Sequence, residues 1–380
     1  MVCGTAAAVP LSEETSPAAM RILLLSRYSP RGPSSRLRHY QFLPALAEAG
    51  LTVTVAPLLP DSYLEALYTG QTRPPRSIAA AYAARIRQMA TARNFDLLWI
   101  EKELLPWFPY GAERWILESA PPYVVDFDDA WFHHYDRSRW PLVRRILGGK
   151  LDRVMQHAAL VAVGNDYLAK RAESAGARSI AILPTVVDLA RYPACSPIDL
   201  SQAAGLPTVG WIGSPITDHY LNLVEEPLRR MVTRDEARIS LVGATSAALS
   251  GLPAERHEWR EETETSHIAL FDIGIMPLAD TPWERGKCGY KLIQYMACGK
   301  PVVASPVGVN RDIVEHGVNG FLAETPEEWT GALCRLAADP DLRRRLGAAG
   351  RAKVERHYSL AGAAPRLIEL LRAAALPSVF

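Results

Sequence analysis

The chain has 380 residues, of which 48% are hydrophobic and 22% charged, and its formal net charge is +1. This length exceeds what one ordinary hydrophobic core supports and predicts two domains, while the near-neutral charge argues against nucleic acid as the main partner. The five cysteines are scattered, odd in number and without a CxxC pair. They predict reduced thiols in a cytoplasmic protein rather than a disulfide framework or a zinc site.

The first 19 residues are expected to form a disordered tail. They lack a basic segment and contain Glu13 and Glu14, which is unlike a signal peptide. No run of 18 apolar residues occurs in the sequence, so no membrane-spanning helix is predicted.

From residue 20 onward, strand-like and helix-like segments alternate. Short apolar runs suited to buried parallel strands occur at 21–26, 51–58, 95–101, 122–129, 160–165 and 179–184. Helical patterns are found between them at 38–50, 78–94, 110–120, 137–158 and 166–176. This alternation predicts a domain of residues 20–190 built on a parallel sheet with helices on both faces.

Prolines and small residues interrupt the alternation at 185–207, and a linker is assigned to 191–207. A second series of strands is expected at 208–213, 238–244, 272–278, 301–305 and 320–323, with helices that include 340–356 and 361–375. The predicted fold is therefore α/β, with two Rossmann-like, doubly wound domains, 20–190 and 208–357, facing a cleft. The segment 358–380 is expected to be a helix that crosses back to the first domain. Ligands of such sheets bind beyond the carboxyl ends of the strands.

Two lysines, Lys287 and Lys291, flank the start of a helix predicted between Gly289 and Gly299. A cation is unfavourable there, because the N-terminus is the positive end of the helix dipole. A second helix is predicted to begin at Asn310. The N–H groups of two helix N-termini, together with the lysines, suit a phosphate group. The alternative interpretation is that both lysines are solvated surface residues.

The motif that contains these lysines runs from 283 to 323, and its most specific parts are 296–299, 301–305, Gly308, 312–314, Gly317 and Gly320. It resembles the C-terminal, donor-binding half of family 4 glycosyltransferases, which have the GT-B fold, and weaker resemblance covers most of the chain. The resemblance implies a nucleotide-diphosphate sugar donor, a hydroxyl acceptor, retention at the anomeric carbon, and no metal or cofactor.

The chain departs from the usual family pattern at its two acidic positions, which correspond to Gly286 and Gln294. The basic residues that many members carry after the first strand of this domain are also missing, and Gly213 and Ser214 stand there instead. The resemblance then implies that Lys287 and Lys291 provide the countercharge for the diphosphate. The donor-binding residues that it implies are Ser35, Arg36, Gly213, Ser214, Lys287, Gly289, Tyr290, Lys291, Gln294, Gly308, Val309 and Asn310. For Ser35 and Arg36, an ordinary surface loop at 29–39 is the alternative.

The tract 126–129, Asp-Phe-Asp-Asp, follows a predicted strand and has two interpretations. An Asp-x-Asp pair can hold a divalent cation, whereas the resemblance places Asp128 against the donor sugar and disfavours a metal. Asp128 and Asp129 are the candidate catalytic residues. Mutual repulsion between the clustered carboxylates is expected to raise the pKa of at least one of them, as at many functional sites.

The basic, apolar segment 137–153 also has two interpretations. It suits weak peripheral contact with anionic lipid on the inner face of a membrane, and it equally suits an ordinary packed helix with a solvated face.

The favoured function is that of a retaining, metal-independent hexosyltransferase in glycan, polysaccharide or glycolipid biosynthesis. Its acceptor is expected to be a glycan, a lipid-linked or a small-molecule hydroxyl. One alternative is a nucleotide-sugar epimerase of GT-B fold, in which Asp128 or Asp129 moves a proton. The other is a catalytically silent partner subunit, which the loss of both family glutamates supports.

Overall fold

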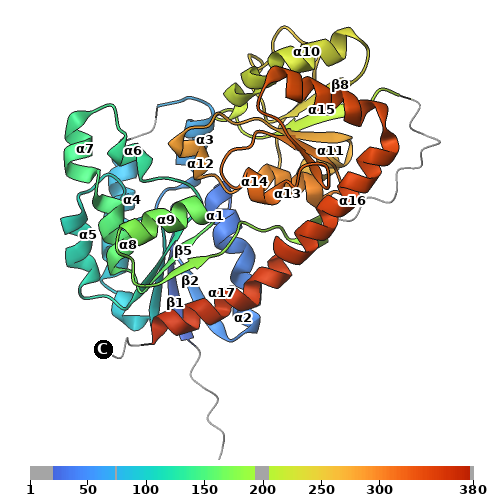
Figure 1. The fold of residues 1–380 in the computed structure, drawn as a ribbon. Coiled ribbons are helices and arrows are strands. Elements are labelled where there is room, and N and C mark those ends of the chain that lie inside the picture. The colour runs from blue at the N-terminus through green and yellow to red at the C-terminus, as the bar shows by residue number, and fades with distance from the viewer. Residues whose placement is uncertain (1–19, 73–74, 193–204, 377–380) are drawn as a thin grey trace, which may run out of the picture.

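The computed structural model describes residues 20–72, 75–192 and 205–376, which form two α/β domains (Figure 1). All six strands of the N-terminal sheet are parallel, and their order is β2 (Leu51–Val55), β1 (Met20–Leu25), β3 (Leu97–Glu101), β4 (Tyr123–Phe127), β5 (Leu160–Val163) and β6 (Ile180–Ile182). The second sheet is also parallel, in the order β12 (Gly320–Leu322), β11 (Val302–Ala304), β10 (Ile273–Met276), β7 (Thr208–Ile212), β8 (Arg238–Val242) and β9 (Glu255–His257). The predicted α/β architecture of two doubly wound domains is confirmed.

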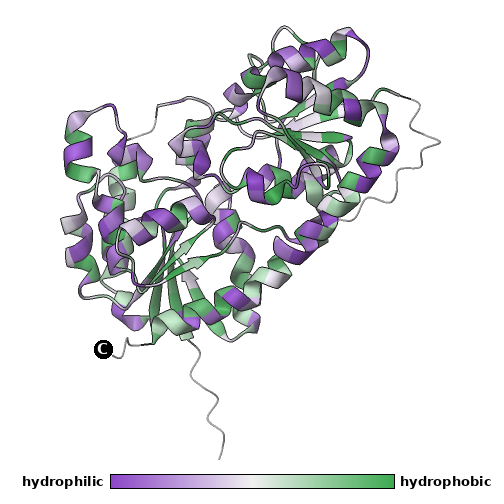
Figure 2. Cartoon of the chain, in the orientation of Figure 1, coloured by the Kyte–Doolittle hydropathy of each residue, from purple (hydrophilic) through white to green (hydrophobic). Residues whose placement is uncertain are grey.

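Helices cover both faces of each sheet. In the N-terminal domain these are α1 (Pro33–Arg38), α2 (Leu43–Glu48), α3 (Asp61–Tyr68), α4 (Pro75–Met89), α5 (Tyr110–Leu117), α6 (His133–Asp136), α7 (Pro141–Leu147), α8 (Lys150–His157) and α9 (Asp166–Ser174). The second domain contains α10 (Glu225–Thr233), α11 (Glu264–Ala269), α12 (Pro282–Arg285), α13 (Tyr290–Ala297), α14 (Asn310–Ile313), α15 (Pro326–Ala338) and α16 (Pro340–His357). Hydropathy is highest along the strands, and the polar residues lie on the outer sides of the helices (Figure 2). This distribution is expected of parallel sheets, because both of their faces are buried.

The last helix, α17 (Leu360–Ala375), leaves the second domain and packs on the N-terminal sheet (Figure 1). Leu367 and Leu371 are buried in the same core as Ile22 and Trp99. The helix is thus part of the N-terminal core although it comes last in the chain, and it fastens one domain to the other.

Local predictions were wrong at four places. The stretch 29–39, expected to be a loop, contains α1, in which Ser35 and Arg36 are buried. The segment 137–158 forms two helices, α7 and α8, because Gly148 and Gly149 interrupt it. Strand β9 was not predicted, since its three residues are polar and lie at the sheet edge. The helix that begins at Asn310 has only four residues. The linker assigned to 191–207 lies mostly outside the described residues, and so does the tail 1–19.

Candidate active site

The two domains are in contact where the loop between α12 and α13 of the second domain reaches the residues that follow β4 and β5 in the first. The side-chain amide of Asn165 donates hydrogen bonds to the carbonyls of Gly286 and Lys287, both at 3.0 Å. The Cys288 thiol donates to the carbonyl of Asp128 at 2.9 Å. The predicted catalytic tract at 126–129 and the predicted donor-binding segment at 286–291 therefore lie side by side at the junction of the domains.

Gly286 is a glycine for a steric reason. A Cβ atom at this position would lie 2.5 Å from Cβ of Ala130 and 2.7 Å from its backbone nitrogen. The first acidic position of the glycosyltransferase pattern that the sequence resembles corresponds to Gly286, and the close approach of Ala130 leaves no room for a side chain there.

We expect Gly286→Ala to open the domain junction, because the added methyl group must displace the backbone at Ala130. Overpacking of this kind costs roughly 1–3 kcal/mol of stability. Small-angle scattering should show a larger radius of gyration, and thermal unfolding a lower midpoint. Gly331→Ala is the matched control, since nothing lies within 4 Å of a Cβ there. An unchanged radius and midpoint for Gly286→Ala would contradict this account.

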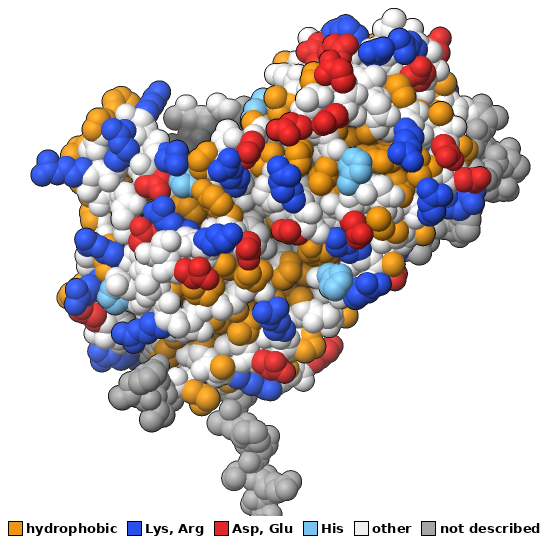
Figure 3. Space-filling model, viewed as in Figure 1, with side chains coloured by type: hydrophobic (Ala, Val, Ile, Leu, Met, Phe, Trp, Pro, Cys, Tyr) orange, Lys and Arg blue, Asp and Glu red, His pale blue; other side chains and the backbone are white. Residues whose placement is uncertain are grey.

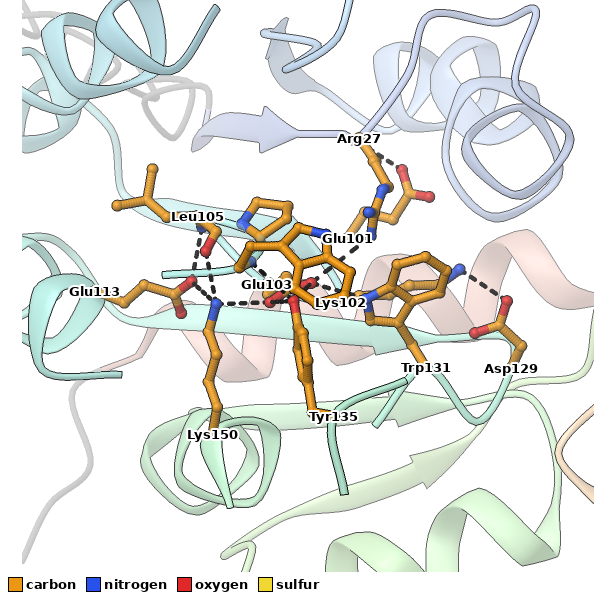
Figure 4. A network of polar contacts seen from close by, with 12 residues as sticks. Arg27, Glu101, Lys102, Glu103, Leu105, Glu113, Asp129, Trp131, Tyr135 and Lys150 are labelled. Atoms are coloured by element: carbon orange, nitrogen blue, oxygen red, sulfur yellow. Dashed lines mark hydrogen bonds and ion pairs between the residues drawn. The ribbon is translucent and has the colours of Figure 1, made fainter. Parts of the chain in front are cut away.

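On the N-terminal side of the junction, Lys102 bridges the two candidate catalytic aspartates, and Figure 4 shows its contact with Asp129. Its ammonium nitrogen lies 2.9 Å from Oδ1 of Asp128 and 3.1 Å from Oδ2 of Asp129. Lys102 follows β3 with a φ of 63°, an unusual backbone conformation for a lysine. The turn brings its side chain, only 4% exposed, beneath the loop that follows β4.

The shared lysine separates the pKa values of the two carboxyl groups. Burial alone would raise the pKa of Asp128, but the charge and hydrogen bond of Lys102, a hydrogen bond from Ser34 and the charge of Arg38 together outweigh it and hold the pKa at about 2. The pKa of Asp129 is raised, because burial and the negative charge of Asp128 together outweigh the attraction of Lys102. The expectation that at least one pKa in this tract is raised is confirmed at Asp129.

A buried ionic network supports this corner of the site (Figure 4). Lys150 is fully buried and pairs with Glu103 at 2.6 Å and with Glu113 at 2.8 Å. Glu103 in turn accepts a hydrogen bond from the indole N–H of Trp131 at 2.8 Å, and the Arg27 guanidinium lies 3.9 Å from the centre of that ring. The network thus holds Trp131, two residues beyond Asp129, in one orientation.

On the opposite side of the junction are the two lysines of the donor-binding segment. The Lys291 nitrogen lies 5.6 Å from the ring centre of Trp211, and Lys287 lies 5.8 Å from the ring of Tyr220. In the described part of the chain, neither forms an ion pair with a carboxylate within 4.0 Å. Burial, with a smaller contribution from Lys287, lowers the pKa of Lys291 to about 7.

Three predicted donor-binding glycines shape the space around these lysines. Gly289 precedes α13 with a φ of 66°, which favours glycine, and a Cβ there would lie 2.3 Å from Ile313. A Cβ at Gly213 would come within 3.0 Å of the Lys291 side chain, and one at Gly308 within 2.6 Å of the Arg285 carbonyl. The backbone N–H groups of Tyr290 and Lys291, the first two of α13, have no partner inside the helix, whereas that of Leu292 donates to the Gly289 carbonyl.

The second predicted helix N-terminus does not provide an anion site of this kind. Helix α14 is a single turn, too short for a useful macrodipole. Asn310, at its start, is 1% exposed and donates to the Ser305 carbonyl at 3.0 Å, while Val309 precedes it half-buried. The carboxamide oxygen of Asn310 has no hydrogen-bond partner in the described residues.

Three other predicted donor-binding residues form contacts within the protein. The buried Ser35 hydroxyl donates to Glu101 at 2.6 Å, which argues against direct contact with a donor. Arg36 reaches across the junction, where it lies 3.5 Å from Glu261 and over the ring of Trp259. The backbone N–H of Ser214 donates to Thr217 within its own loop.

Asp126, the first acid of the Asp-x-Asp pair, is engaged by a cation of the protein itself. Its carboxylate accepts hydrogen bonds from the Arg38 guanidinium at 2.8 and 3.0 Å and is 1% exposed. Across the described residues, no group of three or more His, Cys, Asp or Glu side chains is arranged to hold a metal ion. The Asp-x-Asp interpretation therefore lacks its first ligand.

Gln294 is buried, so it is not a bystander on the outer face of α13. Its amide donates to the Tyr192 hydroxyl at 3.0 Å, and that hydroxyl donates to Glu264 at 2.9 Å. Tyr290 completes the group, with its hydroxyl 3.3 Å from that of Tyr192.

We expect Gln294→Glu to destabilise the protein by roughly 1–3 kcal/mol, because it removes a buried donor and adds a negative charge near Glu264. The loss should be larger at pH 8 than at pH 5, since protonation of the new carboxyl group relieves the repulsion. Denaturant unfolding at both pH values measures it. Gln71→Glu, on an exposed loop, is the control. Equal stability of the Gln294 variant and the wild-type protein would contradict the contact network.

Comparison with solved structures identifies the fold as GT-B. Sucrose-phosphate synthase from Thermosynechococcus elongatus superposes with a TM-score of 0.69 at 17% identity, covering 93% of this chain and 98% of the other. Anabaena HepE in complex with UDP gives 0.66 at 16% identity, covering 93% and 100%. At such identities the likeness shows the fold alone.

Sequence comparison adds a family match confined to the second domain. Residues 206–339 match the model of glycosyl transferases group 1. D-inositol 3-phosphate glycosyltransferase from Thermobispora bispora is 35% identical over 97 residues, which is 24% of this chain and 22% of the relative. The enzyme of the same name from Nocardia farcinica is 29% identical over 189 residues, or 44% of this chain and 42% of the relative. The matched segments thus span less than half of these relatives.

Sequence reasoning missed Lys102, Asn165 and Cys288 as parts of the site. Lys102 follows a predicted strand and could have been noted by that position alone. Asn165 and Cys288 have no such signal, because their partners lie more than 100 residues away. In the described residues, no helix has the length and apolarity that crossing a bilayer requires.

Proposed function

We propose that this protein transfers a glycosyl group from a nucleotide-diphosphate sugar to a hydroxyl acceptor, with retention at the anomeric carbon. The carrying observation is the pair of lysines, Lys287 and Lys291, that flank the start of α13, lie over aromatic rings of their own domain and lack a carboxylate partner within 4.0 Å among the described residues. The match of 206–339 to glycosyl transferases group 1 and the names of the curated relatives support it.

The chemistry follows from the placement of charge. A leaving diphosphate develops negative charge, and Lys287, Lys291 and the free N–H groups of α13 stabilise that charge in a partly water-excluded site. In the free protein the lowered pKa of Lys291 lets this lysine lose its proton, which avoids burying two cations together. When a phosphate group binds, its negative charge favours the protonated form of Lys291.

Asp128 and Asp129 act on the sugar side of the reaction. The ionised Asp128, held by Lys102, accepts hydrogen bonds from donor-sugar hydroxyl groups. Asp129, with its raised pKa, accepts or returns a proton near the acceptor hydroxyl. Contacts such as Asn165 with Gly286 hold the domains together and exclude water, which favours transfer over hydrolysis.

The nucleotide class is tested by a thermal-shift series with UDP, GDP, ADP and dTDP. A ligand at 100 times its dissociation constant adds about 2.7 kcal/mol of stability, so the cognate base should stand out. HepE, which was solved with UDP and with UDP-glucose, makes uridine the first donor to test. No shift with any nucleotide would remove the basis of this proposal.

Product analysis decides the reaction. Transfer to a hydroxyl acceptor with an α-linked product from an α-linked donor, measured by NMR, is expected. Acceptors that carry a phosphate, such as inositol phosphate, deserve inclusion because of the names of the curated relatives. An epimerised sugar formed from donor alone would establish the epimerase instead, and nucleotide binding without any product would establish the silent subunit.

We expect turnover to be independent of divalent cations, because Asp126 is occupied by Arg38 and the lysines provide the countercharge for the diphosphate. Dialysis against EDTA should leave the rate unchanged, and manganese should not increase it. Activity that EDTA abolishes and manganese restores would return Asp128 and Asp129 to the role of metal ligands.

A further inference from the structure

The helix α7 and the residues before it present their apolar side chains to solvent. Leu142 is 67% exposed, Ile146 51% and Trp140 59%, whereas Leu147 is buried. An ordinary packed helix would direct the first three side chains into the core. Val143 and Leu147 do pack on the N-terminal core, so α7 has a packed side and, in addition, leaves Leu142 and Ile146 in solvent.

The same segment is strongly basic. Between 137 and 147 there are four arginines, all exposed, and no acidic residue. The Arg139 guanidinium lies 5.0 Å from the ring centre of Trp140, so the two side chains extend outward together. We name Arg139, Trp140, Leu142, Arg144, Arg145 and Ile146 the α7 surface. Its partner must be both anionic and able to accept apolar side chains.

The α7 surface lies on an outer corner of the N-terminal domain (Figure 1), where basic and hydrophobic side chains alternate over the upper left of the molecule (Figure 3). Helix α5, on the same side, carries Trp115, which is 76% exposed. Trp107, 54% exposed, packs on Tyr135 just before α7. Exposed aromatic rings beside arginines are typical of the interfacial region of a bilayer.

We propose that the α7 surface docks the protein onto an anionic lipid bilayer. Trp140, Leu142 and Ile146 enter the headgroup region, and the arginines bind the lipid phosphates around them. A bilayer suits a protruding corner, because it needs no complementary groove in a partner.

Docking at this corner has a consequence for the site. The α7 surface follows Asp129 by about ten residues through α6, and Trp131 and His134 of that connection lie beside Trp283 of the second domain. A docked molecule therefore holds the domain junction close to the membrane surface. The inference itself is independent of the reaction, and binding tests it without turnover.

Vesicle co-sedimentation tests the docking directly. The full chain is expected to pellet with vesicles of phosphatidylcholine and phosphatidylglycerol, and not with phosphatidylcholine alone. Binding should weaken as salt rises, because the arginine contribution is screened. The double variant Arg144→Gln/Arg145→Gln should bind roughly 25-fold more weakly, and Trp140→Ala/Leu142→Ser/Ile146→Ser at least about tenfold more weakly.

The matched controls carry equivalent changes elsewhere on the surface. Leu270→Ser removes a leucine that is 70% exposed, and Arg345→Gln removes an exposed arginine of α16; both should bind like the wild-type chain. Because all altered side chains are exposed, thermal unfolding should be unchanged in every variant.

Four outcomes would overturn the proposal. The first is wild-type protein that stays in the supernatant with anionic vesicles, and the second is wild-type affinity in the apolar triple variant. The third is binding to immobilised polyglutamate but not to vesicles, which would assign the surface to an acidic protein. The fourth is a dimer of the wild-type chain, detected by light scattering, that the apolar triple variant dissociates. It would assign the surface to a second copy of the chain.

Discussion

Replacement of both Lys287 and Lys291 by methionine is expected to weaken nucleoside-diphosphate binding by at least about 100-fold. Each lysine should contribute a charge-assisted contact of about 1.5–3 kcal/mol to a bound diphosphate. Neither ammonium has a carboxylate partner among the described residues, so methionine, of similar length, removes charge without leaving a buried anion unpaired. Isothermal titration with the nucleotide chosen by the thermal-shift series measures the change.

Lys170→Met is the control, because that lysine is 74% exposed and pairs with Asp166, which is 70% exposed. Its nucleotide affinity should equal that of the wild-type protein. Wild-type affinity in the Lys287/Lys291 double variant would show that both lysines are solvated bystanders, and the assignment of the diphosphate site to α13 would fall with it.

The low pKa of Lys291 gives this binding a characteristic pH dependence. In the free protein burial, with a contribution from Lys287, brings the pKa to about 7, and a bound diphosphate raises it again. Binding then takes up a proton, so affinity should fall by up to about tenfold per pH unit above pH 7. Titration in two buffers of different ionisation enthalpy detects the proton. Lys291→Arg should remove the dependence, because a guanidinium remains protonated throughout.

Lys102→Met is expected to destabilise the protein by about 3–5 kcal/mol, because it leaves two carboxylates, 15% and 21% exposed, without their shared cation. Turnover should fall as well, since Lys102 no longer holds Asp128 in its place. The stability deficit should be larger at pH 7 than at pH 5. Without Lys102 both carboxyl groups should have raised pKa values and take up protons as the pH falls. Protonation removes the cost of burying two negative charges and the repulsion between them.

In the wild-type protein, by contrast, Asp128 makes the folded state less stable as the pH falls. The pKa of Asp128 is depressed to about 2, so its stabilising contribution is present above the ordinary carboxyl pKa and is lost as pH falls through about 2. Denaturant unfolding at pH 7 and pH 5 measures the free energy of unfolding of the wild-type protein and of the Lys102→Met variant. Asp129→Asn added to Lys102→Met should restore part of the loss at pH 7. Equal deficits at the two pH values would show that the lysine acts through packing alone.

The candidate site was only partly accessible from the sequence. Lys287, Gly289 and Lys291 could be placed together because they flank the start of one helix, and short-range periodicity and glycines specify such a start. Ser35 shows the opposite case. Its segment follows the first strand as predicted, yet it forms α1 instead of a loop, and the hydroxyl turns inward to Glu101 on a neighbouring strand. A side chain's direction depends on partners that local patterns do not reveal.

The sequence by itself determined the two parallel sheets, because alternating apolar runs and amphipathic helices are local patterns that hold whatever the rest of the chain does. Only the tertiary structure decided which charges meet. Lys102 reaches Asp128 and Asp129 because β3 and β4 are neighbours in the sheet, and Gly286 lies against Ala130 because the domains close on each other. Such contacts join residues that are distant along the chain, and their energies come from burial and charge in a shared space, which no local pattern encodes.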